Sequence, residues 1–168
     1  MLNNKTIAVV VPAYNESSQI KMVLDSMPSF VDRIIVVDDC SKDDTAKHVK
    51  DYFTNNQSPI GIPSLFKEEI TPTPYNKADV ELWKKAKKEI DYFTPSEVLN
   101  QDDENERIVL IQHKKNGGVG AAIATGYKWC KDHNIFCSAV MAGDGQMDPS
   151  ELESICSPVI NEGVDYVK

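Results

Sequence analysis

Four short apolar runs, each followed by a helical pattern, constrain the fold of this chain more than any other feature. The runs cover residues 6–11, 33–37, 107–112 and 136–141 and are rich in β-branched side chains. Near-continuous apolar character is typical of strands that are buried on both faces of a parallel sheet. Because strands that alternate with helices connect by right-handed crossovers, the order predicts an open α/β sheet, mostly parallel, with helices on both faces.

The helices are predicted from apolar residues that recur at helical spacing after each run. Ser41 and Asp44 resemble a capping box for the second helix, while Asp148 and Pro149 are expected to cap and open the fourth. The apolar positions are Ile20, Val23, Leu24 and Met27, then Ala46, Val49 and Phe53, then Ala121, Ala122, Thr125 and Trp129, and finally Leu152, Ile155 and Val159.

A segment of different composition interrupts this pattern. Residues 51–106 hold 12 Asp and Glu against six Lys and five of the nine prolines, whereas the whole chain has a net charge of −8. We therefore expect one domain, 1–168, with an acidic insert at about 51–106. Within the insert we predict a loop over 55–75, an amphipathic helix over 78–93 that packs on the main domain, and a solvated loop over 102–106. A helix that binds a partner is the alternative.

The composition excludes several classes of protein. A net charge of −8 argues against binding of nucleic acid, and no apolar run approaches the length of a membrane span. The four cysteines lack zinc-ligand spacing and are expected to be reduced thiols of a cytoplasmic protein. Residues 164–168 resemble the start of a fifth strand, which predicts that the chain is a fragment of a longer gene product, incomplete at its C-terminus.

Polar side chains follow each of the four apolar runs, where an open α/β sheet binds its ligands. After the first run, Pro12 is expected to stop the sheet, and Tyr14 and Glu16 either contact a heterocyclic base or simply begin a helix. After the second run, Asp38 and Asp39 point in opposite directions, so that at most one caps a helix and the other can accept from a ribose or a base.

The other two strand ends suggest an anion site and a metal site. Gly117 and Gly118 precede a helix, where their N–H groups can face an anion, and His113 nearby is expected to be structural rather than catalytic. Asp144 ends the fourth run on a glycine turn. Carboxylates gathered at one sheet edge repel an anionic ligand unless a divalent cation bridges them.

These segments occur in a recognisable order. V-V-P-A-Y-N-E, V-V-D-D-C-S-K-D-D-T, N-G-G-V-G-A-A and A-G-D-G-Q-M-D-P resemble glycosyltransferase family 2, and within it the dolichol- or polyprenyl-phosphate glycosyltransferase group. The similarity covers residues 5–50 and 107–168. It implies a GT-A-like fold and an inverting transfer from a UDP- or GDP-linked sugar to a polyprenyl phosphate or a glycan.

The resemblance also implies residue roles. Asp144 matches the last Asp of a D-x-D motif and would bind Mg²⁺ or Mn²⁺ with the donor diphosphate, while Ala142 stands where that motif has its first Asp. A catalytic base, if one is used, and any membrane association at the inner face of a membrane would depend on residues after Lys168. The expected donor contacts are Pro12, Ala13, Tyr14, Glu16, Asp39, Gly118, Asp144 and Gln146.

Two other functions remain open from the sequence. A dinucleotide-dependent oxidoreductase would use the glycine loop for a pyrophosphate, although Ile123 stands where its fingerprint has a third glycine. A non-catalytic module that binds a nucleotide or a partner would instead use the helix over 78–93.

Overall fold

The computed structural model describes residues 1–53, 57–65 and 69–168 and contains a five-stranded sheet with the strand order β3-β4-β2-β1-β5. Four strands are parallel and match the four predicted runs: β1 (Ile7–Ala13), β2 (Arg33–Asp38), β4 (Ile108–His113) and β5 (Cys137–Val140). The prediction of an open, mostly parallel α/β sheet is therefore confirmed.

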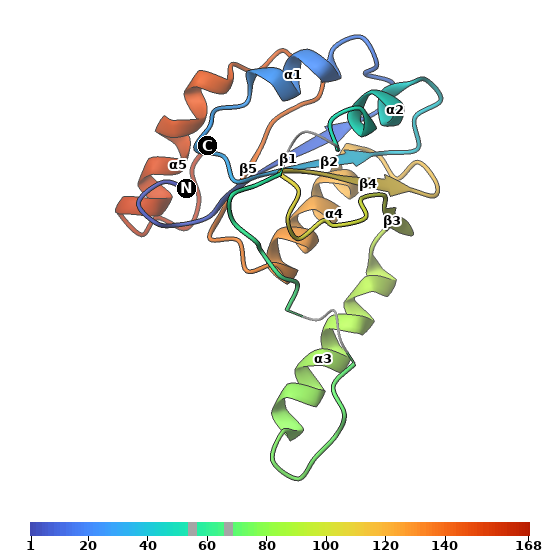
Figure 1. The fold of residues 1–168 in the computed structure, drawn as a ribbon, viewed down its shortest axis with the longest axis vertical. Helices are drawn as coiled ribbons and strands as arrows, with labels where there is room; N and C mark the ends of the chain where they lie inside the picture. The colour runs from blue at the N-terminus through green and yellow to red at the C-terminus, as the bar shows by residue number, and fades with distance from the viewer. Residues whose placement is uncertain (54–56, 66–68) are drawn as a thin grey trace.

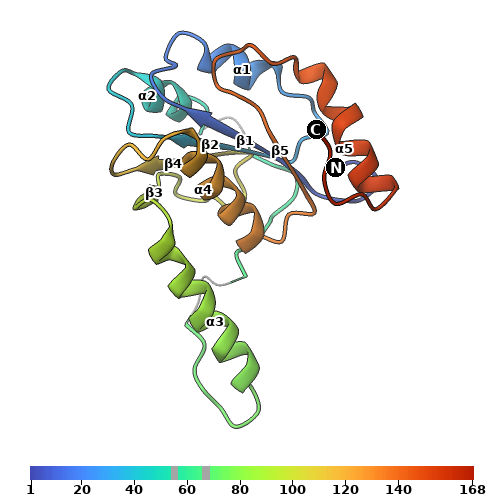
Figure 2. The same ribbon diagram turned by 180° about the vertical axis from the view of Figure 1, so that it is seen from behind.

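Helices cover both faces of the sheet, also as predicted (Figures 1 and 2). Side chains alternate along β1, so that Val9 and Val11 join one buried cluster and Ala8 and Val10 join the other. The first cluster lies under α1 (Ile20–Ser26), α2 (Thr45–Lys50) and α5 (Leu152–Asn161), and the second lies under α4 (Val119–Asp132). No helix among the described residues is both long and apolar enough to span a membrane.

The start of α2 differs from the predicted capping box. Asp44 makes no side-chain hydrogen bond at the helix start, and Ser41 Oγ accepts from Asn15 N at 2.9 Å. The carboxylate of Asp43 instead accepts from Thr45 N at 3.0 Å and from Ser17 N at 3.1 Å. Asp43 therefore both caps α2 and ties it to the loop after β1. By contrast, Asp148 accepts from Ser150 N at 2.9 Å at the start of η2 (Pro149–Glu151), so its predicted role as a cap is confirmed.

Two predictions about strands are wrong, one on where β1 ends and one on a fifth run at the end of the chain. Pro12 lies within β1 and pairs with Val37, because β5 pairs with β1 only as far as Val10, and no neighbouring strand there requires a donor from Pro12. Residues 164–168 form no strand, although residues 165–168 lie beside β5 in a hollow of about 420 Å³ that Cys137 and Ser138 also line.

The insert adds one strand and one projecting helix. The short edge strand β3 (Ser96–Val98) was not predicted and pairs antiparallel with β4. Helix α3 (Lys77–Glu89), followed by the turn η1 (Ile90–Tyr92), confirms the predicted helix, but α3 points away from the sheet instead of packing on it (Figure 1). Its C-terminal end meets α4 through Glu89, which forms ion pairs with Lys131 at 2.8 Å and with Lys128 at 3.9 Å. Residues 55, 56 and 66–68 of the predicted loop lie outside the described residues.

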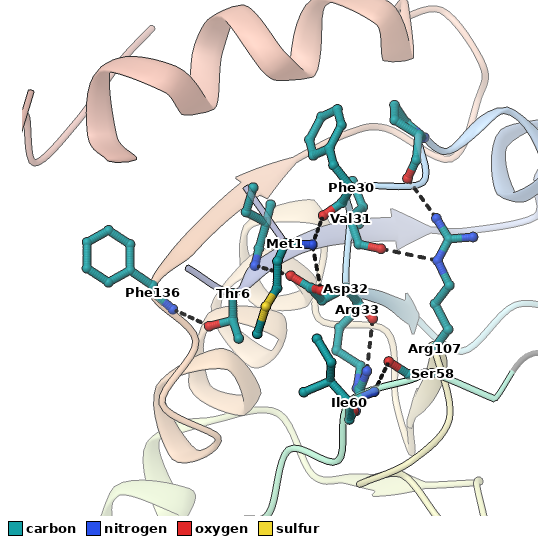
Figure 3. A network of polar contacts seen from close by, with 12 residues as sticks. Met1, Thr6, Phe30, Val31, Asp32, Arg33, Ser58, Ile60, Arg107 and Phe136 are labelled. Carbon is teal, nitrogen blue, oxygen red and sulfur yellow. Dashed lines mark hydrogen bonds and ion pairs between the residues drawn. The ribbon is translucent and has the colours of Figure 1, made fainter. Parts of the chain in front are cut away.

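A network of buried charges holds the amino ends of the strands to the insert and to the loop after α1 (Figure 3). Arg33, which is fully buried, donates from Nη2 to the carbonyl oxygens of Ile60 and Glu104, both at 2.6 Å. Arg107 donates to the carbonyl oxygens of Pro28 at 2.8 Å and Val31 at 3.2 Å. This edge of the sheet is closed by hydrogen bonds within the chain.

Candidate functional site

The candidate site lies at the opposite edge, where the four parallel strands end. Each loop that leaves this edge contains one residue with a positive φ: Asn15 (58°), Cys40 (62°), Gly118 (84°) and Gly145 (73°). Left-handed backbone reverses the chain sharply and is uncommon for a side chain such as that of cysteine. The four loops therefore turn tightly and stay close to the strand ends.

A small hollow of about 90 Å³ brings together four of the predicted donor contacts. Pro12, Ala13, Tyr14 and Asp39 line it, together with Val119 and Ala122 from the start of α4. Tyr14 is 43% exposed, so part of its ring is accessible to a ligand. The hollow thus has aromatic and apolar walls and one carboxylate, a composition suited to a flat heterocycle with N–H groups.

Asp39 is buried at the base of this hollow and is bound on several sides. Its Oδ1 accepts from His113 Nδ1 at 2.7 Å and from Gly117 N at 2.8 Å, and its Oδ2 accepts from Gly118 N at 2.7 Å. Burial raises the pKa of Asp39, but the hydrogen bonds from Gly117, His113 and Gly118 outweigh it and bring the pKa below its usual value. Asp39 is therefore ionised at neutral pH.

The glycine loop binds a carboxylate of the chain itself, that of Asp39. The N–H groups of Gly117 and Gly118, expected to face a ligand, both donate to Asp39. A Cβ on Gly117 would lie 2.5 Å from Thr94 Oγ1, which explains the need for glycine at this position. Gly118 thus supports the hollow through Asp39, and direct contact of Gly118 with a donor stays a prediction.

His113 has partners that sequence reasoning missed. Besides Asp39, its ring contacts Thr125 Oγ1 through Nε2 at 2.9 Å, and the exposed fraction of His113 is only 1%. Asp39 and His113 are 74 residues apart, yet they lie at the ends of the adjacent strands β2 and β4. A polar residue at each of two neighbouring strand ends was the signal that could have suggested this contact.

The two carboxylates after β2 do point in different directions, as predicted. Asp38 accepts from Gln112 Nε2 at 2.7 Å and from Ser41 N at 3.2 Å, and it does not line the hollow. Asp38 therefore holds the loop after β2, while Asp39 faces the hollow.

Asp144 lies close enough to Glu16 for its charge to affect the pKa of Glu16. The pKa of Glu16 is raised by burial and then by the negative charges of Asp144 and Asp43. Asp144 Oδ1 accepts only from Gln146 N, at 3.0 Å, among the hydrogen bonds of the described residues. Gln146 is exposed and lines a separate hollow of about 290 Å³ beside α1, so the structure does not bring it to Tyr14.

A ready-made metal cage is absent from the part of the chain that the structure describes, because no three His, Cys, Asp or Glu side chains gather around one point. Mg²⁺ commonly uses only one or two carboxylates together with the phosphates of its substrate. Asp144, with Glu16 beside it, fits a cation that arrives with a diphosphate rather than one held by protein ligands alone.

Comparisons with known proteins find relatives of this chain, and one match covers a segment that lines the hollow. The model of the family described as "Glycosyl transferase family 2" matches residues 8–64, a range that contains Pro12, Tyr14, Glu16 and Asp39. The chain is 28% identical over 165 residues to the UDP-N-acetylglucosamine–dolichyl-phosphate N-acetylglucosaminyltransferase of Methanococcus voltae. That match covers 98% of this chain and 51% of the relative, so the chain spans about half the length of the curated relative.

A solved structure supports the fold. The crystal structure of residues 1–349 of S. aureus TarS superposes with a TM-score of 0.51 at 18% identity and covers 94% of this chain and 32% of that one. The resemblance to glycosyltransferase family 2 and the GT-A-like α/β fold are therefore both confirmed.

Proposed function

We propose that this chain, with its confirmed resemblance to glycosyltransferase family 2, is the donor-binding part of an inverting glycosyltransferase. The donor is a UDP- or GDP-linked sugar, bound with a divalent cation. The observation that carries the proposal is the hollow at the carboxyl edge of the sheet, where Pro12, Ala13, Tyr14 and Asp39 meet. These residues come from segments that the family match covers.

The hollow suits the nucleoside of such a donor. Tyr14 offers an exposed ring face on which a base can stack. Asp39 Oδ2 accepts from Gly118 N and has room for a second donor, because each carboxylate oxygen accepts about two hydrogen bonds. A base N–H or a ribose hydroxyl is the group that Asp39 would bind.

The diphosphate then belongs near Glu16 and Asp144. Two neighbouring carboxylates repel a diphosphate, and the pKa of Glu16 is raised by burial and then by the charges of Asp144 and Asp43. Asp144 would hold Mg²⁺ or Mn²⁺ together with the donor phosphates, and the bound cation supplies Lewis acidity toward the departing diphosphate. Because Ala142 carries no carboxylate, we expect the cation to bind weakly without the donor.

The relative's name supports a lipid phosphate as acceptor, since it includes dolichyl phosphate. A phosphate oxygen is already anionic and nucleophilic, so its attack on the sugar has less need of a general base. We extend the proposal to a polyprenyl phosphate or, as the alternative acceptor, a glycan. The site would then face the cytoplasm, at the inner side of a membrane.

The contacts of the glycine loop count against an oxidoreductase. A dinucleotide site requires the backbone N–H groups of its glycine loop for the pyrophosphate. Here the N–H groups of Gly117 and Gly118 already donate to Asp39. A pyrophosphate at this loop would have to displace a buried carboxylate.

Thermal unfolding in the presence of nucleotides tests the proposal. We expect UDP or GDP with Mn²⁺ or Mg²⁺ to raise the Tm by about 5–10 °C at a concentration of about 100 times the Kd, and less when EDTA is present. Asp144→Asn should remove the cation-dependent part of the increase, and Asp148→Ser, which keeps a capping oxygen, should retain it. If neither UDP nor GDP raises the Tm, or if only NAD does, the proposal fails.

A further inference from the structure

Three buried polar side chains lie in a row behind the hollow. Asp39, His113 and Thr125 come from the loop after β2, the end of β4 and the middle of α4, and their exposed fractions are 3%, 1% and 6%. The two contacts in this row, Asp39 Oδ1 to His113 Nδ1 and His113 Nε2 to Thr125 Oγ1, measure 2.7 and 2.9 Å. They lie against the apolar cluster under α4, which includes Val37, Ile111 and Ala122.

Burying three polar side chains costs hydration free energy. Each buried polar group must recover in hydrogen bonds what it loses in hydration, and replacing a buried polar network by well-packed apolar side chains is often neutral or stabilising. Packing alone therefore does not account for these three residues. Their end point, Asp39, is instead the one carboxylate that lines the hollow.

The direction of each hydrogen bond in the row follows from the ionised state of Asp39. Ionised Asp39 can only accept, so His113 Nδ1 carries a hydrogen and donates to Oδ1. In a neutral imidazole, Nε2 then has the lone pair and accepts from the hydroxyl of Thr125. Thr125 thus orients the ring of His113, and the ring in turn orients the carboxylate.

The two oxygens of Asp39 end up with different roles. Oδ1 is saturated by His113 and Gly117, whereas Oδ2 has a single donor in Gly118. We infer that His113, held by Thr125, is a positioning residue that fixes Asp39 so that Oδ2 accepts a hydrogen bond from the bound nucleoside. This inference rests on the proposed function, since it assigns His113 to the nucleotide site.

Two near-isosteric substitutions separate the contacts of His113. Asn places its amide nitrogen near the position of imidazole Nδ1, and Gln places it near Nε2. His113→Asn can therefore still donate to Asp39 but loses Thr125, while His113→Gln can still reach Thr125 but loses Asp39. We expect the Kd for UDP or GDP with Mn²⁺, measured by calorimetry, to rise about tenfold or more in the Gln variant and about threefold or less in the Asn variant.

A second pair tests the other end of the row. Thr125→Val keeps the shape of the side chain but removes the hydroxyl, and Thr125→Ser keeps the hydroxyl. We expect the Val variant to weaken nucleotide binding about threefold and the Ser variant to bind like the wild type. A purely structural role would instead lower the Tm of both His113 variants without this difference in Kd.

The outcomes separate this inference from the proposed function. If the wild type binds neither UDP nor GDP, the proposed function fails. If the wild type binds and His113→Gln binds with the same Kd, only the role of His113 is overturned. If His113→Gln does not fold, the Thr125 pair decides: weaker binding by the Val variant alone supports the inference, and equal binding by both overturns it.

Discussion

The two ends of the parallel strands, the amino edge and the carboxyl edge of the sheet, differ in how their charged residues are bound. At the amino edge, Arg33 donates to the carbonyl oxygens of Ile60 and Glu104, and Asp32 accepts from Ile7 N at 2.8 Å. At the carboxyl edge, burial and then the negative charges of Asp144 and Asp43 raise the pKa of Glu16. One edge binds its charged groups within the chain, with Arg33 Nε as an exception among the described atoms, whereas the other leaves negative charge for a ligand to neutralise.

This difference separates residues that stabilise the fold from residues that serve binding. Burial lowers the pKa of Arg33, while Asp32, Asp102 and Asp103 counteract that effect, so the guanidinium remains charged where it is fully enclosed. No comparable neutral acceptor or donor set surrounds Asp144, whose only side-chain hydrogen bond among the described residues is local. Substitutions at the first edge should therefore change stability, and substitutions at the second should change ligand binding.

The largest effect is expected at the amino edge. Arg33→Met would leave the carbonyl oxygens of Ile60 and Glu104 without their shared donor, which should lower the free energy of unfolding by about 3–5 kcal/mol. Urea unfolding followed by circular dichroism measures this loss. The Kd of the folded variant for UDP or GDP should match that of the wild type, and a loss below about 1 kcal/mol would show that Arg33 does not anchor the insert.

A glycine pair at the carboxyl edge gives an intermediate effect. In Gly117→Ala the new Cβ would lie 2.5 Å from Thr94 Oγ1 and 2.9 Å from Ala121 Cβ, so the loop that holds Asp39 must move. We expect a loss of about 1–3 kcal/mol in stability and about tenfold weaker nucleotide binding.

Gly120→Ala is the matched control, because a Cβ there meets nothing within 4 Å and helix α4 favours alanine. It should bind nucleotide like the wild type and be equally or slightly more stable. Equal binding by both variants, measured by calorimetry, would separate the glycine loop from the nucleotide site.

The same two edges show what could be predicted from the sequence. The four parallel strands were predictable because each lies within a mostly apolar run, and Tyr14 and Asp39 were placed at the site because each follows such a run. The edge strand β3 was not, since Ser96, Glu97 and Val98 are all exposed and show no apolar pattern. Their pairing depends on β4, which the local sequence does not reveal.

Contacts between distant segments account for the other differences. The bond from His113 to Asp39 spans 74 residues and depends on the order of β2 and β4 in the sheet. The apolar spacing of α3 indicated a helix but not its partner: Val80 and Ala86 are buried, at 6% and 7% exposure, although α3 points away from the sheet (Figure 1). Periodicity predicts which residues share a face, whereas the partner of that face depends on the path of the chain.

The smallest effect is expected at Glu16, where stability and binding should change in opposite directions. Because the pKa of Glu16 is raised in the folded state, its ionised form favours unfolding at neutral pH. Glu16→Gln should therefore be more stable than the wild type at pH 7, by no more than about 0.5 kcal/mol for so accessible a group. This gain should disappear as the pH falls below about 4.5, where Glu16 is protonated in both states.

Glu81→Gln provides the opposite sign, since a hydrogen bond from Lys84 lowers the pKa of Glu81 on the projecting helix α3. Its stability should fall slightly at pH 7, and the difference from the wild type should vanish as the pH falls through the pKa of Glu81. Urea unfolding between pH 3.5 and about pH 7 measures both variants. If Glu16→Gln is more stable and yet gains less Tm from UDP or GDP with Mn²⁺, the charge that destabilises the free chain is the charge that the cation and the nucleotide require.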